Sequence, residues 1–419
     1  MVKSVRRVYL DYNATAPLRP EALEVMTESY ARFGNPSSVH AEGRAARGLV
    51  EQARMQVAAL VGAAASEVVF TGGGSEANTA ILSPNLRLTG ACTINGCTLE
   101  PGKPLSLLLV GATEHPSVLS GGRFEAGKVE RIPVHASGEL DREWLAGRLR
   151  RLEHEQPGTA ALVSVQVANS ETGVLQPLQD IADIVHMAGG LIHADAVQAA
   201  GRMVLNIHEL GVDALTLSAH KLGGPQGVGA IVLASPMLDP GLPLIRGGGQ
   251  EKGRRAGTEN VAGIAGFGIV SELALREMDQ YPDQCREWRD RFERWLSERF
   301  PQAVIFGRQD SGLQEDSGLQ VRRLGNTSAF AFPGLRAETL LMALDLAGVA
   351  VSSGSACSSG KVLRSPVLEA MGVEPGLAEG ALRVSLGWAT TAEDIDLFMA
   401  TLEKVAGMLI SRHKGRAAA

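Results

Sequence analysis

The chain has 419 residues and a net charge of −6 at pH 7, with 45% hydrophobic and 21% charged residues. This length allows one large or two medium domains, while the acidic balance and the 4% aromatic content argue against a nucleic-acid partner. No run of 18 apolar residues and no apolar signal segment is present, so we expect a cytoplasmic protein with no membrane partner.

The first half of the chain alternates short apolar strands with helices. Strands are expected at residues 8–10, 68–70, 107–110, 129–134, 160–167, 191–196 and 214–217, and helices at 20–33, 40–61 and 180–188. Most of these strands end in polar or glycine-rich segments. The alternation predicts an α/β fold with a mostly parallel central sheet flanked by helices, in which ligands bind at the carboxyl ends of the strands.

A glycine-rich turn follows the strand at residues 68–70. Its sequence, TGGGSEAN at residues 71–78, contains Gly74 and Ser75 and leads into a helix. Glycines let the backbone approach a phosphate group, and the free N–H groups of a helix N-terminus can bind it. The same pattern is also common as a simple helix cap, so the turn alone is weak support for a phosphate site.

Residues 83–106 contain several prolines and glycines, and we expect an irregular surface insertion there. Cys92 and Cys97 lie inside it, but a metal site would need two further ligands and none is nearby, so no metal is expected. With only four cysteines in the chain, a disulfide framework is not expected either.

Polar residues follow two further strands of the predicted sheet. His115 comes after the strand at residues 107–110 and could either cap the next helix or stack on a flat cofactor and move protons. Asn169 follows the strand at 160–167. Both residues are therefore placed at the predicted ligand-binding edge.

Asp195 ends the strand at residues 191–196, and Lys221 follows the strand at 214–217. The spacing between them suits a strand–crossover–strand unit, so both can reach the same end of the sheet. A lysine that forms a Schiff base and an aspartate that pairs a pyridinium nitrogen are the minimal equipment for pyridoxal phosphate. A structural ion pair is the alternative, although buried ion pairs are poor stabilisers.

The segment PLIRGGGQEKGRRAGTEN at residues 243–260 is basic and rich in glycine. It could be a solvated linker or a loop that covers an anion. A smaller α+β domain is expected to follow, so that residues 16–264 form the large domain and residues 1–15 with 265–419 form the small one.

Cys357 lies in the small domain, among serines and glycines. Structural cysteines prefer apolar surroundings, so this setting favours a reactive thiol over a plain linker. Arg383 on a later strand is a candidate to bind a carboxylate through two hydrogen bonds.

These segments together resemble one family over almost the whole chain. The matching stretches are YLDYNATAP, FGNPSS, FTGGGSEAN, EHPSVL, VANSETG, HADAVQ, SAHKLGGPQGVG, GGGQEKGRRAGTEN, SSGSACSSG and LRVSLG. They resemble the cysteine desulfurases of the NifS/IscS type, which are fold-type I pyridoxal-phosphate-dependent transferases. The combination of SSGSAC with an upstream SAHK is highly specific.

The resemblance implies a role for each matching residue. Lys221 forms the Schiff base, His115 stacks on the cofactor ring, and Cys357 attacks the sulfur of L-cysteine and carries it as a persulfide. The cofactor-binding residues are Gly74, Ser75, His115, Asp195, Gln198, Ser218, His220, Lys221 and Thr258, the last reaching the phosphate of the other subunit. Asn169 and Arg383 bind the substrate carboxylate. A homodimer and a sulfur-acceptor or Fe–S scaffold protein are the implied partners.

Four departures from the family concern partner choice more than chemistry. Ser75 stands where many members have threonine, and Trp388 replaces a more polar residue. The insertion at residues 83–106 and the polar stretch at 310–321 are both longer than usual. A selenocysteine lyase or aminotransferase of the same fold would not need Cys357. A sulfur- or metal-trafficking scaffold without catalysis would not need the cofactor.

Overall fold

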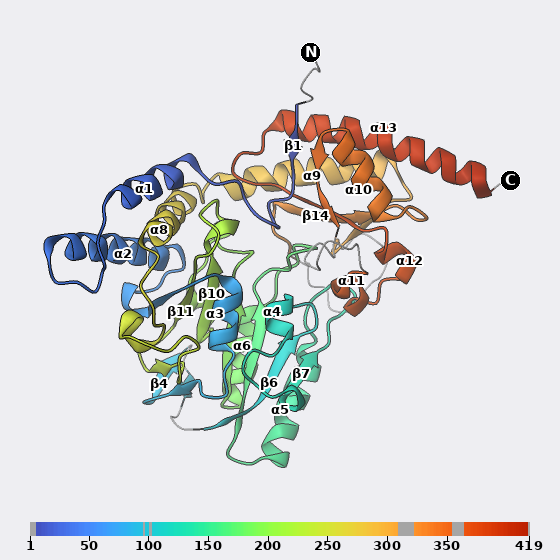
Figure 1. Ribbon diagram of the computed structural model, residues 1–419. Helices are drawn as coiled ribbons and strands as arrows, with labels where there is room; N and C mark the ends of the chain where they lie inside the picture. Colours follow the sequence, from blue (N-terminus) through green and yellow to red (C-terminus); the bar gives the residue numbers. More distant parts are fainter. Residues whose placement is uncertain (1–5, 95–96, 100–102, 309–321, 354–363, 418–419) are drawn as a thin grey trace.

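The computed structural model describes residues 6–94, 97–99, 103–308, 322–353 and 364–417. Cys357 and the polar stretch 310–321 therefore lie outside the described residues. In Figure 1 a large sheet with its helices occupies the lower part of the molecule, and a smaller sheet with α9, α10 and α13 lies above it.

The large sheet has seven strands in the order β2-β11-β10-β9-β8-β6-β7. Their bounds are β2 Val68–Thr71, β6 Leu105–Gly111, β7 Val129–Ile132, β8 Ala160–Gln166, β9 Leu191–Asp195, β10 Ala214–Ser218 and β11 Gly229–Leu233. The neighbours from β10 to β7 pair in parallel, while β11 is antiparallel to both β10 and β2. The predicted mostly parallel α/β sheet is confirmed.

Helices cover the large sheet because its central strands are apolar on both sides. Every residue of β8, β9, β10 and β11 is buried, as parallel sheets require. The helices of this part are α1 Pro20–Ala31, α2 Ala41–Leu60, α3 Gly74–Ile81, α4 Pro116–Leu119, α5 Arg142–Glu155, α6 Leu178–Met187, α7 Ile207–Leu210 and α8 Val261–Arg276. α8 packs closely on α2: a Cβ at Gly268 would lie 2.6 Å from the Cα of Ala53.

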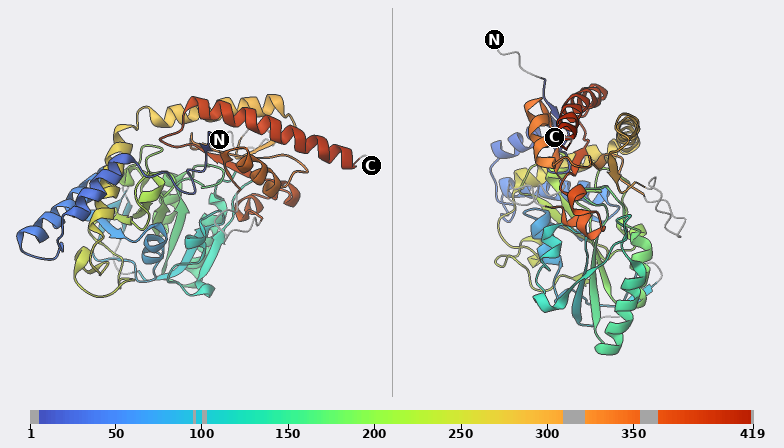
Figure 2. Two further views of the ribbon diagram at one scale, coloured as in Figure 1. Left: turned by 45° about the horizontal axis from the view of Figure 1, so that its top comes forward. Right: turned by 90° about the vertical axis from the view of Figure 1, so that its right-hand side faces the viewer.

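The smaller sheet has four antiparallel strands in the order β13-β14-β17-β16. They are β13 Val304–Phe306, β14 Thr327–Ala331, β16 Ser352–Ser353 and β17 Leu382–Ser385, and the helices are α9 Tyr281–Arg299, α10 Ala337–Leu346, α11 Pro366–Ala370, α12 Pro375–Ala378 and α13 Ala392–Ala417. α9 and α13 lie side by side (Figure 2). Their core is aromatic, with Phe292 in ring contact with Phe330 and Phe398.

The N-terminal strand β1 (Val8–Tyr9) pairs in parallel with β15 (Val349–Ala350), so the start of the chain packs on the smaller sheet. The predicted boundary between the large and the small domain, between residues 264 and 265, falls inside α8. This division into domains stays a prediction. No helix among the described residues is long and apolar enough to cross a membrane.

The expectation of an irregular insertion at residues 83–106 is wrong in part. β3 (Arg87–Leu88) pairs with β12 (Leu238–Asp239), and β4 (Cys92–Ile94) pairs with β5 (Cys97–Leu99). These strands are two or three residues long, which is too short for an alternating apolar pattern to appear in the sequence.

Candidate active site

A cavity of about 340 Å³ lies where β9 and β10 end, and residues of both sheets line it. The predicted site residues that line it are Gly74, Ser75, His115, Asp195, Gln198, Ser218, His220, Lys221 and Arg383. Asn169 and Thr258 are not among the lining residues, and Cys357 lies outside the described residues. The strand ends therefore bring most of the predicted residues together.

Lys221 ends a short 3-10 helix, Ala219–Lys221, that follows β10 directly. Its Nζ donates hydrogen bonds to the backbone carbonyls of Asn13, at 2.5 Å, and Ala14, at 2.8 Å. The following Gly223 has φ +88°, and a Cβ there would lie 2.8 Å from Arg19. The glycines after the lysine thus allow a tight turn that returns the chain to β11.

Asp195 ends β9, and both oxygens of its carboxylate are bonded. Oδ1 accepts the backbone N–H of Val197 and Oδ2 accepts Nδ2 of Asn78, each at 2.9 Å. Thr216 in turn donates to Oδ1 of Asn78 at 2.6 Å. Asn78 therefore fixes the orientation of the carboxylate at the cavity wall, much as outer residues orient a metal ligand.

His115 caps α4 and also lines the cavity. The capping alternative is confirmed, while stacking on a cofactor stays a prediction. Its Nδ1 accepts the backbone N–H of Ser117 at 3.2 Å. Burial, with help from the charge of Lys221, lowers the pKa of the imidazole against the opposing effect of Asp195. The ring is therefore neutral at pH 7, with its proton on Nε2.

Glu114, beside His115, is a buried carboxyl group that the sequence interpretation missed. Its Oε1 accepts the backbone N–H of Gln166, and its Oε2 has no hydrogen-bond partner among the residues that the structure describes. Burial first, and then the charge of Asp195, raise the pKa of Glu114 well above its ordinary value. Burial therefore favours the protonated form of this carboxyl group.

The turn between β2 and α3 approaches the cavity closely. Gly73 has φ +145°, and a Cβ at Gly74 would lie 3.1 Å from Val197 and 3.4 Å from Ser218. On the same side, burial lowers the pKa of His220 to about 4, so this imidazole is neutral at pH 7. The space in front of the helix N-terminus suits a phosphate group.

Arg383 lies on β17 with only 3% of its side chain exposed. Nη2 donates to Oδ1 of Asp11 at 2.7 Å and Nη1 donates to the carbonyl of Ser170 at 3.2 Å. Its buried Nε has no hydrogen-bond partner in the described part of the chain. A buried guanidinium with a donor to spare fits a carboxylate ligand.

Asn169 is buried but is used within its own turn. Its Oδ1 accepts the backbone N–H groups of Glu171 and Thr172, each at 2.9 Å. Gln198 does line the cavity, where its Nε2 donates to the carbonyl of Asn13 at 3.1 Å. Thr258 is exposed. The roles of these three residues toward ligands stay predictions.

Asn13 and Asn78 are two of the cavity residues to which sequence reasoning gave no role. Both lie in segments already quoted for the resemblance, YLDYNATAP and FTGGGSEAN. Their position inside those segments is the signal that could have identified them.

One cavity thus contains a lysine amine, an oriented carboxylate, a glycine turn at a helix N-terminus and an incompletely bonded arginine. This donor set fits pyridoxal phosphate with an amino-acid substrate.

Comparison with known proteins agrees with this assignment. The Aminotransferase class-V family matches residues 8–398. The chain is 40% identical over 411 residues to a cysteine desulfurase of Cereibacter sphaeroides, covering 97% of each chain. It is 38% identical over 404 residues to the cysteine desulfurase IscS of Dictyoglomus turgidum, covering 96% of this chain and 94% of that protein. The structure of a NifS-like protein from Rickettsia africae superposes with a TM-score of 0.81 at 32% identity, covering 96% of this chain and 100% of the other.

Proposed function

This chain belongs to the aminotransferase class-V family, and from that premise we propose that it is a pyridoxal-phosphate-dependent cysteine desulfurase that converts L-cysteine to L-alanine. The observation that carries the proposal is the cavity that joins Lys221, Asp195 and Arg383 in a chain whose relatives are cysteine desulfurases over nearly their full length.

The residues of the cavity would divide the cofactor and the substrate between them. The residues near the phosphate group would be Gly74, Ser75, Ser218 and His220, with Thr258 supplied by the other subunit. Asp195 would pair the ring nitrogen, Gln198 the ring hydroxyl, and Lys221 the reactive carbon. When bound, pyridoxal phosphate supplies an electrophilic carbon and a ring that accepts electrons.

The chain's own side chains then provide binding and proton transfer. Arg383 binds the substrate carboxylate through its guanidinium group, whose Nε has no hydrogen-bond partner among the described residues, and so orients the amino acid. The amine of Lys221 takes the proton from the substrate α-carbon. Nε2 of the neutral His115 is the ring atom that can deliver or receive a proton on the cavity side, because Nδ1 is bonded to Ser117.

Cys357 is the proposed nucleophile toward sulfur, as its sequence setting predicts. Its thiolate attacks the substrate thiol sulfur, a sulfur–sulfur bond forms, and the carbon–sulfur bond breaks. The electron pair of the broken bond returns to carbon, which takes up a proton to give alanine, and the sulfur stays on Cys357 as a persulfide. A sulfur-acceptor or Fe–S scaffold protein then receives it.

The homodimer, the acceptor protein and a cytoplasmic location rest on the resemblance and remain proposals. One observation supports a second subunit: Thr258 is exposed and does not line the cavity of its own chain, so a phosphate contact would have to be made in another copy. Exposed apolar side chains of the α1–α2 region, Tyr30, Phe33 and Val39, offer surface for such a contact.

Absorbance and product analysis test the proposal. The wild-type protein with added pyridoxal phosphate should show a visible absorption band and release alanine and sulfide from cysteine. Lys221→Ala should lose the band and alanine release. Cys357→Ala should keep the band but form no sulfide, and unchanged sulfide output would instead indicate a lyase that does not use this thiol. A colourless wild-type protein would support a non-catalytic scaffold.

A further inference from the structure

Among the described residues, β2 is an edge strand of the large sheet, and β11 is its one strand neighbour. Buried backbone groups at a sheet edge must find other partners. The carbonyl of Val68 accepts Nη1 of Arg54 at 2.9 Å, and the N–H of Phe70 donates to Oε2 of Glu251 at 2.9 Å. Side chains from α2 and from the basic loop at residues 243–260 thus complete this edge.

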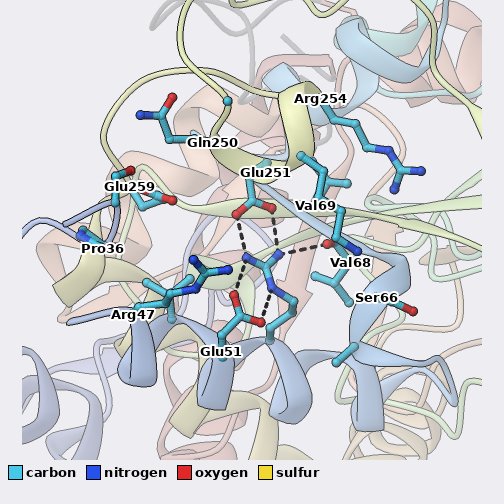
Figure 3. Close-up of a pocket in the computed structure, with 16 residues that line it drawn as sticks. Pro36, Arg47, Glu51, Ser66, Val68, Val69, Gln250, Glu251, Arg254 and Glu259 are labelled. Carbon is cyan, nitrogen blue, oxygen red and sulfur yellow. Dashed lines mark hydrogen bonds and ion pairs between the residues drawn. The ribbon is translucent and has the colours of Figure 1, made fainter. Parts of the chain in front are cut away.

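Arg54 and Glu251 also form a two-pronged ion pair with each other. The two nitrogen–oxygen distances are both 2.7 Å, and the side chains are 11% and 2% exposed. Glu51 and Glu251, labelled in Figure 3, line a cavity of about 560 Å³ beside β2, and Arg54 forms ion pairs with both of them. The guanidinium lies 4.8 Å from the ring centroid of Phe70. Such a buried, two-pronged pair holds its partners in one geometry.

A second ion pair joins the same loop to the glycine turn. Nε of Arg255 donates to Oε1 of Glu76 at 3.0 Å, while Oε2 of Glu76 accepts the backbone N–H of Gly72 at 2.8 Å. Phe70 and Gly72 therefore each donate to a carboxylate, and each carboxylate is paired with an arginine. Both pairs connect the loop with the segment that enters α3.

The loop itself is under backbone strain at this place. Glu251 has φ 48° and Lys252 has φ 58°, and they are the non-glycine residues with positive φ in the described part of the chain. Left-handed backbone at a non-glycine residue is costly and persists where surrounding contacts fix it. At this place Arg54 and the N–H of Phe70 both bind the Glu251 carboxylate.

Two residues beyond Gly72 the chain reaches Gly74 and then Ser75, which line the candidate active site. We propose that Glu251 and Arg255, with Arg54 and Glu76, form an ionic brace that positions the β2–α3 turn for the cofactor phosphate. This inference rests on the proposed function. The four residues are positioning residues: they act through the turn and do not line the cavity.

The test compares two probes that differ by the phosphate group alone. Apoprotein is titrated with pyridoxal phosphate and, separately, with pyridoxal, for the wild type, Glu251→Gln and Arg255→Met, and each apoprotein is also melted. Glu251→Gln removes the charge while leaving an oxygen acceptor. Because hydrogen bonds to charged groups are among the strong ones, we expect the dissociation constant of pyridoxal phosphate to rise roughly tenfold in Glu251→Gln. We expect that of pyridoxal to change less than twofold.

Glu403→Gln is the matched control, because it breaks an exposed Arg299–Glu403 pair of comparable length, at 2.6 Å, far along the chain in α13. It should leave both dissociation constants unchanged. If Glu251→Gln does not fold, Arg255→Met tests the brace in its place. It removes the Arg255–Glu76 pair, whose side chains are 26% and 19% exposed.

Three results would overturn the brace: unchanged affinity for pyridoxal phosphate, equal weakening of both probes, or a lower melting temperature with no change in either affinity. A wild-type protein that binds neither probe would instead overturn the proposed function. The two failures are therefore distinguishable in one set of titrations.

Discussion

The two ends of the candidate active site differ in which parts of the molecule supply their contacts. We call the part of the site where we propose that the cofactor phosphate binds, at Gly74, Ser75, Ser218 and His220, the phosphate end. The β2–α3 turn at this end is tied by two arginine–carboxylate pairs. All of the partners come from α2, α3 and the loop at residues 243–260. This end is therefore built within the large sheet and its covering segments.

We call the part of the site where we propose that the substrate carboxylate binds, at Arg383, Asn169 and Glu171, the carboxylate end. The contacts there run between the regions of the two sheets and include the ion pair of Arg383 with Asp11. Arg383 on β17 donates to the carbonyl of Ser170. Ser365, the N-cap of α11, donates to Oε2 of Glu171 at 2.6 Å. Burial raises the pKa of Glu171 to about 7, against the opposing effects of Ser365 and Arg383. This end thus depends on buried polar contacts. One of the groups that make them, the carboxyl group of Glu171, titrates near neutral pH.

The difference indicates what each end must do. A phosphate group that stays bound during catalysis needs a β2–α3 turn of fixed position. Ion pairs within the region of the large sheet hold the turn in that position. A substrate carboxylate binds and leaves in each turnover. Its proposed binding residues come from the regions of both the large and the smaller sheet, so the relative position of these two regions determines how well the carboxylate fits. Changes at the carboxylate end should therefore affect both stability and catalysis, while changes at the phosphate end should affect mainly cofactor affinity.

Asn13→Ala should have the largest effect, because the Asn13 side chain bonds residues of both the large and the smaller sheet regions. Its Nδ2 donates to the carbonyl of Ser170 and to Thr327, and its Oδ1 accepts from the buried Arg202 at 2.8 Å. Removing the amide leaves a buried guanidinium with one acceptor fewer, so the free energy of unfolding should fall by about 3 kcal/mol. Urea unfolding of the apoprotein measures this.

The control for this substitution is Asn35→Ala, at an exposed turn where Oδ1 accepts the N–H of Ser37. It should cost less than about 1 kcal/mol. Equal losses in the two variants would mean that Asn13 does not connect the sheets energetically.

Arg383→Lys tests the carboxylate end by catalysis. Lysine keeps the charge but loses the planar set of donors that bonds Asp11, Ser170 and a ligand together. We expect kcat/KM for cysteine to fall roughly 100-fold, mainly through KM, with the cofactor still bound. Steady-state alanine release checks this, and Arg364→Lys at an exposed pair with Glu379 is the control. A loss below threefold would remove Arg383 from substrate binding.

Glu171→Gln tests the pH dependence of the same end. The native pKa of about 7 lies above the ordinary value near 4.3, so the folded state binds more protons and stability falls as pH rises between the two values. The wild type should lose roughly 2 kcal/mol of unfolding free energy between pH 5 and pH 7 from this group, with no further loss well above pH 7.

Glutamine stays neutral and can still accept the hydrogen bond from Ser365, so the variant should lack this part of the pH dependence. Urea unfolding at pH 5, 6, 7 and 8 measures the difference between the two proteins. Parallel pH profiles would show that Glu171 is not protonated in the folded state.

The sequence was sufficient for the central sheet and for most of the cavity wall, because both depend on local signals. Buried parallel strands are continuous apolar runs, and polar residues directly after them must lie at one edge. Asp195, Lys221 and His115 were found in this way. The short strands within residues 83–106 were missed, since their pairing partners include β12, about 150 residues later.

The polar contacts behind the cavity wall could not be predicted from local pattern. Whether an asparagine points to a ligand or to its own turn depends on backbone geometry, and Asn169 bonds its own turn while Asn78 bonds Asp195. Glu251 lies in the segment for which the sequence allowed either a solvated linker or a loop that covers an anion. Its side chain is only 2% exposed. Its burial depends on Arg54, almost 200 residues earlier.

Lys252→Gly should have the smallest effect and tests the strain at the phosphate end. Lys252 is exposed with φ 58° and ψ 31°, a conformation that glycine adopts freely. Relief of this strain exceeds the added chain entropy of glycine in the unfolded state, so stability should rise by about 0.5 kcal/mol. Lys404→Gly, at an exposed site inside α13, should instead lose about 1 kcal/mol. Thermal melting of the two variants should therefore give shifts of opposite sign. A decrease for both would mean that the loop at Lys252 carries no strain, and that the ion pair of Glu251 fixes a conformation the backbone already prefers.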